Sequence, residues 1–531
     1  MEPSRRASQR DQGEDGALSV AVTEVEVLIV GAGVSGIGSA WHLATRCPDR
    51  SFLILEGRDR IGGTWDLFRY PGIRSDSDMY TFGYRFRPWT EGKVFADGPS
   101  IRRYVADTAS EHGIHRRIRF GHTVTEARFD TASARWTVRA QTDAGLRVFR
   151  CRFLLMCAGY YRYDRGHRPA FPNEHAFKGR FVHPQHWPED LNLRGKRVLV
   201  IGSGATAVTI VPAIADEAAH VTMLQRSPTY IAAWPSRDKW ADRLHRFLPA
   251  GLAHRLIRRK NILGGIGFYQ LSQRLPERVK RNVMEAARAA IDDPTVDVDF
   301  HFSPSYKPWD QRFCLAPDGD FFAAIRDGKA SIATDHIARF TADGVELKSG
   351  EHIPADVVVT ATGLEMLLFG GIPLYLDGKR LRASELVTYR GMMLGHVPNF
   401  AVAFGYTNAS WTLKVDLTAE RVCRLLNYMR RHGYDLCVPT PPADLERAPL
   451  LTFSSGYVQR ALDELPRQGS RPPWRTYQNY VQDMLAIRYG RLRDGHMVFK
   501  RAQEPPGPAV QGDGMARSDV ELAAASQPIA Q

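Results

Sequence analysis

Short runs of apolar, mainly β-branched residues recur along the chain, and two of them continue in the same way. Residues 25–30 (VEVLIV) and 197–201 (RVLVI) each run directly into a glycine, Gly31 and Gly202, and then into a segment rich in small and apolar residues. A short run with this composition indicates a strand buried on both faces, and the segment after it indicates a helix packed on that strand. The pattern predicts two βαβ units with parallel strands.

Two further apolar runs, at residues 151–156 and 357–360, indicate buried strands that end in small-residue turns. We expect a domain crossing after each, so that the second unit is inserted into the first. The predicted fold class is α/β, with two Rossmann-like dinucleotide-binding domains and a helical insertion. Its segments are a flexible leader (1–23), the first domain (24–165 and 354–500), a linker (166–192), the second domain (193–353) with a helical subdomain (240–295), and a disordered tail (501–531).

Composition narrows the class of protein. Apolar residues make up 44% of the 531 residues and charged residues 24%, which is typical of a folded globular chain. Six scattered cysteines without a C-x-x-C pair exclude a disulfide framework and favour a reducing compartment such as the cytoplasm. The first 22 residues lack the apolar core of a secretory signal, and the longest stretch without charged residues, 391–413, contains Pro398 and several glycines. We therefore expect neither a secretory signal nor a transmembrane helix.

The formal net charge of +13 favours polyanionic partners, among them phosphorylated cofactors and acidic lipid. The helical segment carries a basic group, Arg255, Arg258, Arg259 and Lys260. A solvated helix surface is the common explanation for such a face, and a weak peripheral contact with an anionic membrane is the alternative. Nothing in the pattern indicates nucleic-acid binding or selects an oligomeric state.

The first glycine turn has the spacing of a dinucleotide site. Gly31, Gly33 and Gly36 follow a strand and open a helix, so they can form the tight turn, admit a pyrophosphate and seat the helix on the strand. Twenty residues later Glu56 ends the strand 52–55, at the position where an acid accepts hydrogen bonds from an adenosine ribose. The next turn, 61–66, resembles that of flavoproteins with two dinucleotide sites, and this resemblance implies FAD.

The second turn, Gly202-Ser203-Gly204-Ala205-Thr206-Ala207, is the G-x-G-x-x-A variant of the same motif. The strand that follows, 221–224, ends in Gln225-Arg226-Ser227 instead of an acid. Loss of the acid together with an adjacent guanidinium favours a ribose 2′-phosphate, so we expect NADP here. Arg226 as an ordinary surface residue is the alternative.

A motif in the predicted linker resembles the fingerprint of a known enzyme family. Phe177, Gly179, His183, Trp187 and Pro188 match the F-x-G-x-x-x-H-x-x-x-W-P fingerprint of type I Baeyer–Villiger monooxygenases, which the chain resembles from about residue 25 to 501. A second family pattern, G-G-x-W-x-x-x-x-Y-P-G-x-x-x-D, matches without exception at Gly62, Gly63, Trp65, Tyr70, Pro71, Gly72 and Asp76. Segments 63–72, 183–191 and 405–412 further resemble one subgroup of that family. His183 and His186 lack the carboxylate or cysteine partners of a metal site, and no metal is expected.

The resemblance implies an NADPH- and O2-dependent enzyme that converts ketones to esters or lactones through a C4a-peroxyflavin, and the subgroup adds sulfides and thioamides as substrates. It implies that Arg312 is the catalytic arginine, a permanently charged group suited to an anionic oxygen in a dry site. Asp76 is implied to pair with it. Many relatives carry a lysine before this arginine, where this chain has Gln311, so 2′-phosphate binding is expected to depend more on Arg226.

The remaining site residues are implied by the same resemblance. His183 is expected to join the linker to a moving domain. The residues expected to hold FAD are Gly31, Gly33, Ser35, Gly36, Glu56, Thr64, Trp65, Asp66, Leu67, Asp76 and Val124. The residues expected to hold NADP are Arg74, Gly202, Ser203, Gly204, Ala205, Thr206, Ala207, Val208, Arg226 and Ser227. Two other functions stay open: a flavin monooxygenase acting on nitrogen or sulfur, and a nucleotide-sensing flavoprotein without turnover.

Overall fold

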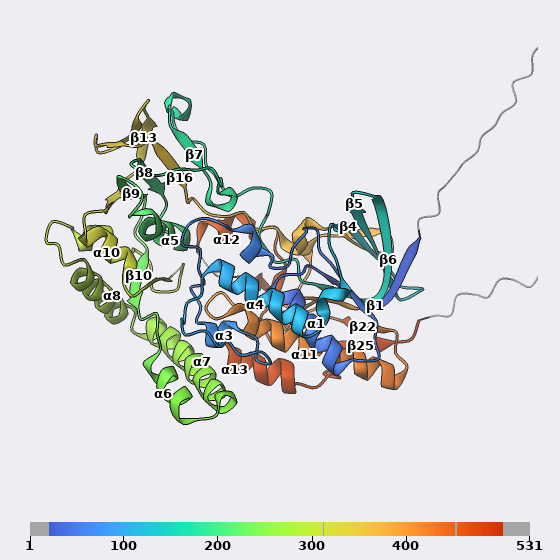
Figure 1. The fold of residues 1–531 in the computed structure, drawn as a ribbon. Coiled ribbons are helices and arrows are strands. Elements are labelled where there is room, and N and C mark those ends of the chain that lie inside the picture. Colours follow the sequence, from blue (N-terminus) through green and yellow to red (C-terminus); the bar gives the residue numbers. More distant parts are fainter. Residues whose placement is uncertain (1–20, 312, 452–453, 503–531) are drawn as a thin grey trace, which may run out of the picture.

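The computed structural model describes residues 21–311, 313–451 and 454–502, and it contains two large sheets (Figure 1). The first has nine strands in the order β18-β17-β4-β5-β6-β1-β2-β3, and β21 pairs with the far end of β6. Strands β3, β2, β1, β6 and β21 run parallel, and β4, β5 and β6 form an antiparallel ribbon. The strands are β1 (Val22–Val30), β2 (Phe52–Leu55), β3 (Ile118–Arg119), β4 (Thr123–Asp130), β5 (Arg135–Thr142), β6 (Gly145–Met156), β17 (Leu374–Leu376), β18 (Lys379–Leu381) and β21 (Phe400–Val402).

The second sheet is wholly parallel, in the order β12-β9-β8-β16-β7. Its strands are β7 (Arg180–Val182), β8 (Arg197–Ile201), β9 (His220–Gln225), β12 (Ala330–Thr334) and β16 (Val357–Thr360). Pairs and one meander complete the strands: β10 (Tyr230–Trp234) with β11 (Phe313–Pro317), β13 (Ile337–Phe340) with β14 (Gly344–Leu347) and β15 (His352–Pro354), β19 (Thr388–Tyr389) with β20 (Met393–Leu394), β22 (Leu436–Pro439) with β25 (Met497–Lys500), and β23 (Arg447–Pro449) with β24 (Arg467–Gly469).

Helices cover both sheets. The α-helices are α1 (Val34–Arg46), α2 (Thr64–Leu67), α3 (Met79–Phe82), α4 (Gly98–Glu111), α5 (Ala205–Ile214), α6 (Lys239–Phe247), α7 (Ala250–Arg274), α8 (Pro276–Ile291), α9 (Val298–His301), α10 (Asp320–Arg326), α11 (Trp411–His432), α12 (Gly456–Ala461) and α13 (Tyr480–Asp483). Short 3₁₀ turns lie at Ile114–Arg117, Glu174–Ala176, Pro184–His186, Leu368–Gly371 and Ala383–Glu385, and a π-helical turn lies at Met484–Tyr489. Among the described helices, none combines the length and the apolar character needed to cross a bilayer.

Alternating burial explains why both sheets form from continuous apolar runs. In β1, Val27 and Ile29 pack into the cluster shared with α1 and α11, whereas Leu28 and Val30 pack on the opposite face with residues of β5 and β6. In the second sheet, Val198 and Val200 face one cluster and Leu199 and Ile201 the other. Both faces of each strand are buried, which confirms the strands predicted at residues 25–30, 151–156, 197–201 and 357–360.

The chain leaves the second sheet after residues 357–360, where a crossing was predicted, so the bound of 354 given to the first domain is too early. Strand β16 pairs with β8 and with β7, so it completes the second sheet even though it lies beyond residue 354, where the first domain was expected to resume. Strand β7 comes from the segment expected to be a linker. The chain rejoins the first sheet at β17. Pairing partners of a buried strand are set by the whole sheet, which local hydrophobicity does not reveal.

Helices α6, α7 and α8 occupy the segment where a helical subdomain was predicted, and α6 and α7 form the lower-left lobe in Figure 1. The predicted basic surface is wrong for one of its four residues, Arg258. Arg258 is buried at 6% exposure and points towards the first sheet's helices, whereas Arg255 and Arg259 are exposed. Lys260 pairs with Asp238 at 2.5 Å.

Candidate functional site

A cavity of about 1950 Å³ lies between the two sheets, and both glycine turns open into it. Its wall includes 16 of the residues predicted to bind cofactors: Gly31, Gly33, Ser35, Glu56, Thr64, Trp65, Arg74, Asp76, Val124, Gly202, Ser203, Gly204, Ala205, Thr206, Arg226 and Ser227. Gly36, Asp66, Leu67, Ala207 and Val208 do not line the cavity, and neither do the fingerprint residues. Arg312 lies outside the described residues, while its neighbour Gln311 lines the cavity.

The first turn leaves no room for side chains where a pyrophosphate would approach. Gly31 has φ +103°, and a Cβ on it would lie 2.6 Å from the carbonyl oxygen of Cys157. A Cβ on Gly36 would lie 1.9 Å from the carbonyl oxygen of Gly31. Gly33 precedes α1 and no side chain caps that helix, so its first amides remain for an anion. The turn therefore fits a dinucleotide such as FAD.

Glu56 ties this turn to the end of β2. Its Oε2 accepts a hydrogen bond from the backbone N–H of Ala32 at 2.7 Å, and its Oε1 accepts one from Arg58 N–H at 3.0 Å. Burial raises the pKa of Glu56, and the two backbone amides oppose that rise. A carboxylate has about four acceptor positions, so it can also accept bonds from ribose hydroxyls. The position of Glu56 at the end of β2, with acceptor positions left over after its two backbone contacts, fits the predicted contact with a ribose.

The turn at α2 presents only part of its predicted set to the cavity. The hydroxyl groups of Thr64 and Tyr163 lie 3.3 Å apart, and both residues line the cavity with Trp65. Asp66 instead points away, with a side chain 1% exposed that pairs with Arg58 at 2.5 Å. We conclude that Asp66 fixes α2 in place from below the cavity wall.

Trp411 and Tyr160 line the cavity, but neither is among the site residues predicted from the sequence. Trp411, the first residue of α11, donates from its indole N–H to Ser35 Oγ at 2.8 Å and stacks on Tyr160 with ring centroids 5.0 Å apart. A Cβ on Gly405 would lie 2.3 Å from the Trp411 ring, so only glycine admits the indole. The one available signal was the segment 405–412, which the sequence analysis used for family resemblance and not for binding.

The second turn repeats the construction of the first. Gly202 has φ +132°, and a Cβ on it would lie 2.3 Å from the carbonyl oxygen of Ala361. Ser203 Oγ donates to the carbonyl oxygen of Ser227 at 3.1 Å, which links the turn to the end of β9. Gly204 leaves the N-terminus of α5 without a side-chain cap. This turn also fits a dinucleotide pyrophosphate.

The end of β9 has no carboxylate to offer. Gln225 is buried, and its amide donates to the carbonyl oxygen of His301 at 2.7 Å and to Thr334 Oγ1 at 2.8 Å. Arg226 is exposed and lines the cavity beside Ser227. The arrangement suits a 2′-phosphate, because a guanidinium lies at the cavity wall and no acid repels the phosphate from the position of Gln225.

Arg74 and Asp76 lie on the loop between α2 and α3. Arg74 forms an ion pair with Asp320, the first residue of α10, so in this structure its guanidinium connects the loop to the second sheet's helices. Asp76 is exposed within the cavity wall. Both residues line the cavity into which the two glycine turns open.

The fingerprint residues build a joint outside the cavity. Phe177 packs with Phe181 and Phe340, and a Cβ on Gly179 would lie 2.4 Å from the carbonyl oxygen of Asp356. Trp187 packs against the core of the second sheet. The fingerprint therefore attaches β7 to that sheet, and its side chains do not reach the cavity.

His183 is part of the same joint. A Cβ on Gly166 would lie 2.0 Å from the imidazole, so the backbone of the linker lies directly against the ring. His183 Nδ1 accepts a hydrogen bond from the N–H of Gln185 at 3.2 Å. Burial lowers the pKa of His183, which favours the neutral ring near pH 7. Within the described residues, no cluster of His, Cys, Asp and Glu could hold a metal ion.

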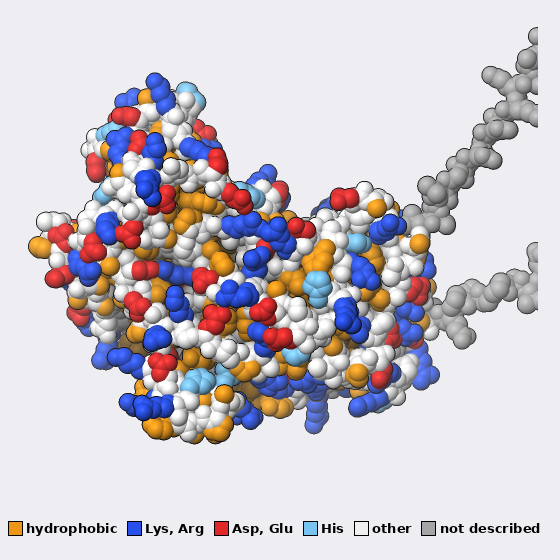
Figure 2. Space-filling view, viewed as in Figure 1, with side chains coloured by type: hydrophobic (Ala, Val, Ile, Leu, Met, Phe, Trp, Pro, Cys, Tyr) orange, Lys and Arg blue, Asp and Glu red, His pale blue; other side chains and the backbone are white. Residues whose placement is uncertain are grey.

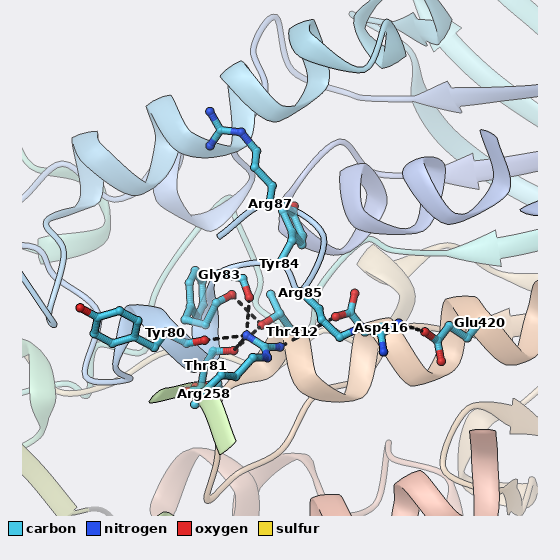
Figure 3. Close-up of polar contacts among 12 residues, drawn as sticks. Tyr80, Thr81, Gly83, Tyr84, Arg85, Arg87, Arg258, Thr412, Asp416 and Glu420 are labelled. Carbon is cyan, nitrogen blue, oxygen red and sulfur yellow. Dashed lines mark hydrogen bonds and ion pairs between the residues drawn. The ribbon is translucent and has the colours of Figure 1, made fainter. Parts of the chain in front are cut away.

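Helix α7 closes the cavity from the side of the helical subdomain. Asn261, Ile262 and Phe268 of this helix line the cavity. Arg258 anchors it: its Nη1 donates to the carbonyl oxygens of Tyr80, Thr81 and Gly83, at 2.7, 3.1 and 2.8 Å (Figure 3). Its Nη2 lies 3.9 Å from Asp416 of α11.

Comparisons with known proteins agree with this geometry. Residues 84–248 match the model "Flavin-binding monooxygenase-like", and residues 29–96 match "NAD(P)-binding Rossmann-like domain". The chain is 52% identical over 485 residues to the FAD-containing monooxygenase EthA of Mycobacterium tuberculosis, a match that covers 91% of this chain and 99% of EthA. It is 48% identical over 481 residues to the probable FAD-binding monooxygenase AlmA of Acinetobacter baylyi, covering 90% and 96%.

Solved structures share the fold. A steroid monooxygenase bound to NADP aligns with a TM-score of 0.71 at 22% identity, over 90% of this chain and 100% of that one. Cyclohexanone monooxygenase in an open form aligns with a TM-score of 0.69 at 20% identity, over the same shares. These alignments confirm the α/β fold with two dinucleotide-binding domains, and the identity with EthA over nearly its whole length shows that the chain belongs to the family of FAD-containing, flavin-binding monooxygenases.

Proposed function

We propose that this chain is a Baeyer–Villiger monooxygenase that uses FAD, NADPH and O2 to convert ketones to esters or lactones, and that it also oxidises sulfides and thioamides. The observation that supports this most is that both glycine turns open into one cavity, which Asp76 also lines. The similarity to EthA and to a steroid monooxygenase bound to NADP supports the pair of cofactors. Six free, buried cysteines support a reducing compartment such as the cytoplasm.

Bound FAD would supply the redox and oxygen-transfer chemistry, which no side chain provides. The chain's own residues bind and orient. Gly31 and Gly33, with the uncapped start of α1, would hold the flavin's pyrophosphate, and Glu56 would hold its ribose. Trp65, Val124 and Trp411 exclude water from the wall around it.

The second turn would hold the nicotinamide cofactor in the same cavity. Gly202 and Gly204 would admit its pyrophosphate, and Arg226 would pair with its 2′-phosphate. Arg74 pairs with Asp320 in this structure, and we propose that it would contact this cofactor where the cofactor meets the flavin.

Arg312 is proposed to carry the fixed positive charge beside the reacting oxygen, with Asp76 positioning it. A guanidinium keeps its charge at any working pH and needs no reorganisation when negative charge develops on the substrate oxygen. Loss of a preorganised donor of this kind costs on the order of 3–4 kcal/mol of activation free energy.

The proposal is tested by supplying the purified yellow protein with NADPH, O2 and a panel of linear, cyclic and aryl ketones plus one sulfide, with product analysis. Ester from any ketone supports it. Sulfoxide without ester would instead indicate an N- or S-oxidising monooxygenase, and NADPH consumption that no substrate stimulates would indicate a nucleotide-binding flavoprotein without this activity.

The role of Arg312 has a separate test. We expect Arg312→Ala to keep flavin reduction by NADPH and to lose oxygenated product, because only the later step needs the extra charge. Arg226→Ala is the matched arginine control, since it is expected to change NADPH affinity while ester still forms. Retained ester formation in Arg312→Ala would reject the assigned role.

A further inference from the structure

The outer face of the α6–α7 lobe is apolar and basic at the same time. Trp240 and Phe247 of α6 are 61% and 72% exposed, and Leu252, Leu256 and Leu263 of α7 are also exposed. Arg243, Arg246, Arg255 and Arg259 are exposed among them. Figure 2 shows hydrophobic and basic side chains together over this lower-left lobe. We call these nine residues the outer face.

Packing within the chain does not account for the outer face. Helix α7 docks on the first domain through the opposite stripe, where Ala253 and Ile257 join a cluster with Tyr80, Val94 and Phe95. Leu252, Leu256 and Leu263, in contrast, recur at spacings of four and seven residues and form a second stripe directed to solvent. A helix that met only protein and water would need polar residues at these positions.

Charge narrows the partner. Over α6 and α7, residues 239–274, the sequence has one acid, Asp242, and eight Lys and Arg residues. Of these eight, Arg258 is buried and Lys260 pairs with Asp238. A face rich in Leu, Phe and Trp with interspersed Lys and Arg is the composition of helices that lie in the interface of a bilayer with anionic lipids. A nucleic acid would pair with the charged residues but would leave the exposed leucines in water. A second copy of this chain would place arginines against arginines. Both partners therefore fit the outer face less well than an anionic bilayer.

We propose that the outer face of α6 and α7 docks peripherally on an anionic lipid bilayer. Trp240, Phe247 and the leucines enter the boundary between headgroups and acyl chains, and the arginines pair with lipid phosphates. The opposite side of α7 lines the cavity through Asn261, Ile262 and Phe268, so docking places the cavity one helix away from the bilayer and gives apolar substrates a short path. This inference does not depend on which substrate the enzyme oxidises.

The test is flotation of the full-chain protein with vesicles of phosphatidylglycerol and phosphatidylcholine in equal parts, compared with vesicles of phosphatidylcholine alone. We expect binding to the mixed vesicles that weakens as salt rises, because exposed charges are screened. Each basic residue near an anionic surface contributes about a fivefold gain in affinity, so R255Q/R259Q is expected to weaken binding by about 25-fold. W240S/F247S is expected to reduce binding at every salt concentration.

Matched controls lie on other surfaces. F300S removes an exposed aromatic ring of α9, and R103Q/R382Q removes two exposed arginines. All four variants should retain wild-type NADPH oxidation in solution, which shows that they fold. The proposal is overturned if the mixed vesicles bind no protein, if the controls weaken binding as much as the outer-face variants, or if W240S/F247S abolishes a dimer in solution while vesicles bind no protein.

Discussion

Arg258 holds the helical subdomain against the first domain, and its removal should loosen that contact without touching either glycine turn. Its Nη1 carries two N–H groups but faces three carbonyl oxygens at 2.7 to 3.1 Å, so it supplies about two full hydrogen bonds. A hydrogen bond to a charged group contributes about 1.5–3 kcal/mol net, and breaking a buried ionic contact costs about 3–5 kcal/mol. Both values indicate that Arg258→Met loses about 4 kcal/mol of the free energy that docks α7 on the first domain. This corresponds to about a thousandfold change in the docking equilibrium.

Hydrogen–deuterium exchange followed by peptide mass spectrometry measures this directly. In Arg258→Met we expect amides of α7 to exchange up to about a thousandfold faster, because local opening of the helix controls their protection. Amides of β1 and β8 should keep their protection. Arg258→Lys should give an intermediate result, since an ammonium keeps the charge but lacks the planar fork.

Arg259→Met is the control, because its exposed side chain lies one residue along the same helix. If Arg258→Met leaves exchange in α7 within about threefold of the wild type, the three carbonyl contacts contribute little and the reasoning is refuted. Equal acceleration in Arg259→Met would show that loss of any arginine loosens the helix, and would refute it as well.

Three further changes test other parts of the site. Gly36→Ala should prevent stable FAD loading, measured by flavin absorbance per protein, because the new Cβ would lie 1.9 Å from the carbonyl oxygen of Gly31; a normal yellow protein would contradict this. Arg226→Ala should raise the KM for NADPH about tenfold or more while that for NADH changes little, since a charge-assisted pair with phosphate is worth at least about 1.5 kcal/mol; equal effects on both cofactors would argue against a 2′-phosphate contact. Burial next to Arg258 lowers the pKa of His254 to about 4; the unfolded chain therefore binds a proton first, and stability should fall by about 3 kcal/mol as pH drops from about 6.5 to 4. His254→Phe should flatten that part of the pH–stability profile, and an unchanged profile would show that another group titrates there.

Local sequence predicts the two turns well because each requires conformations that few residues adopt. Gly31 and Gly202 both have φ above +100°, and both pass within reach of a carbonyl oxygen that follows a neighbouring strand. The two glycine turns were therefore predictable from the spacing of their residues. The Trp411–Ser35 contact was not, because it joins residues 376 positions apart and neither local pattern indicates that the two pair.

The basic face of α7 shows where helical periodicity stops being informative. Arg258 and Arg259 are adjacent in sequence and look alike, yet one is buried against three carbonyl oxygens and the other is exposed. The leucines of α7 are exposed, so the most hydrophobic stripe of the helix is not the one that packs on the protein. Only the docking of Ala253 and Ile257 on the first domain fixes which arginine turns inward.

The fingerprint residues lie away from the cavity because binding a cofactor and packing a strand onto a sheet require different residues. A cofactor wall needs glycines, backbone amides and a few charges, as at Gly31, Glu56 and Gly202. The attachment of β7 to the second sheet instead needs rings and a glycine packed to contact, as at Phe177, Gly179 and Trp187. Because these residues fix β7 on that sheet and do not line the cavity, we expect a substitution there to act on the packing of the second sheet without contacting either cofactor.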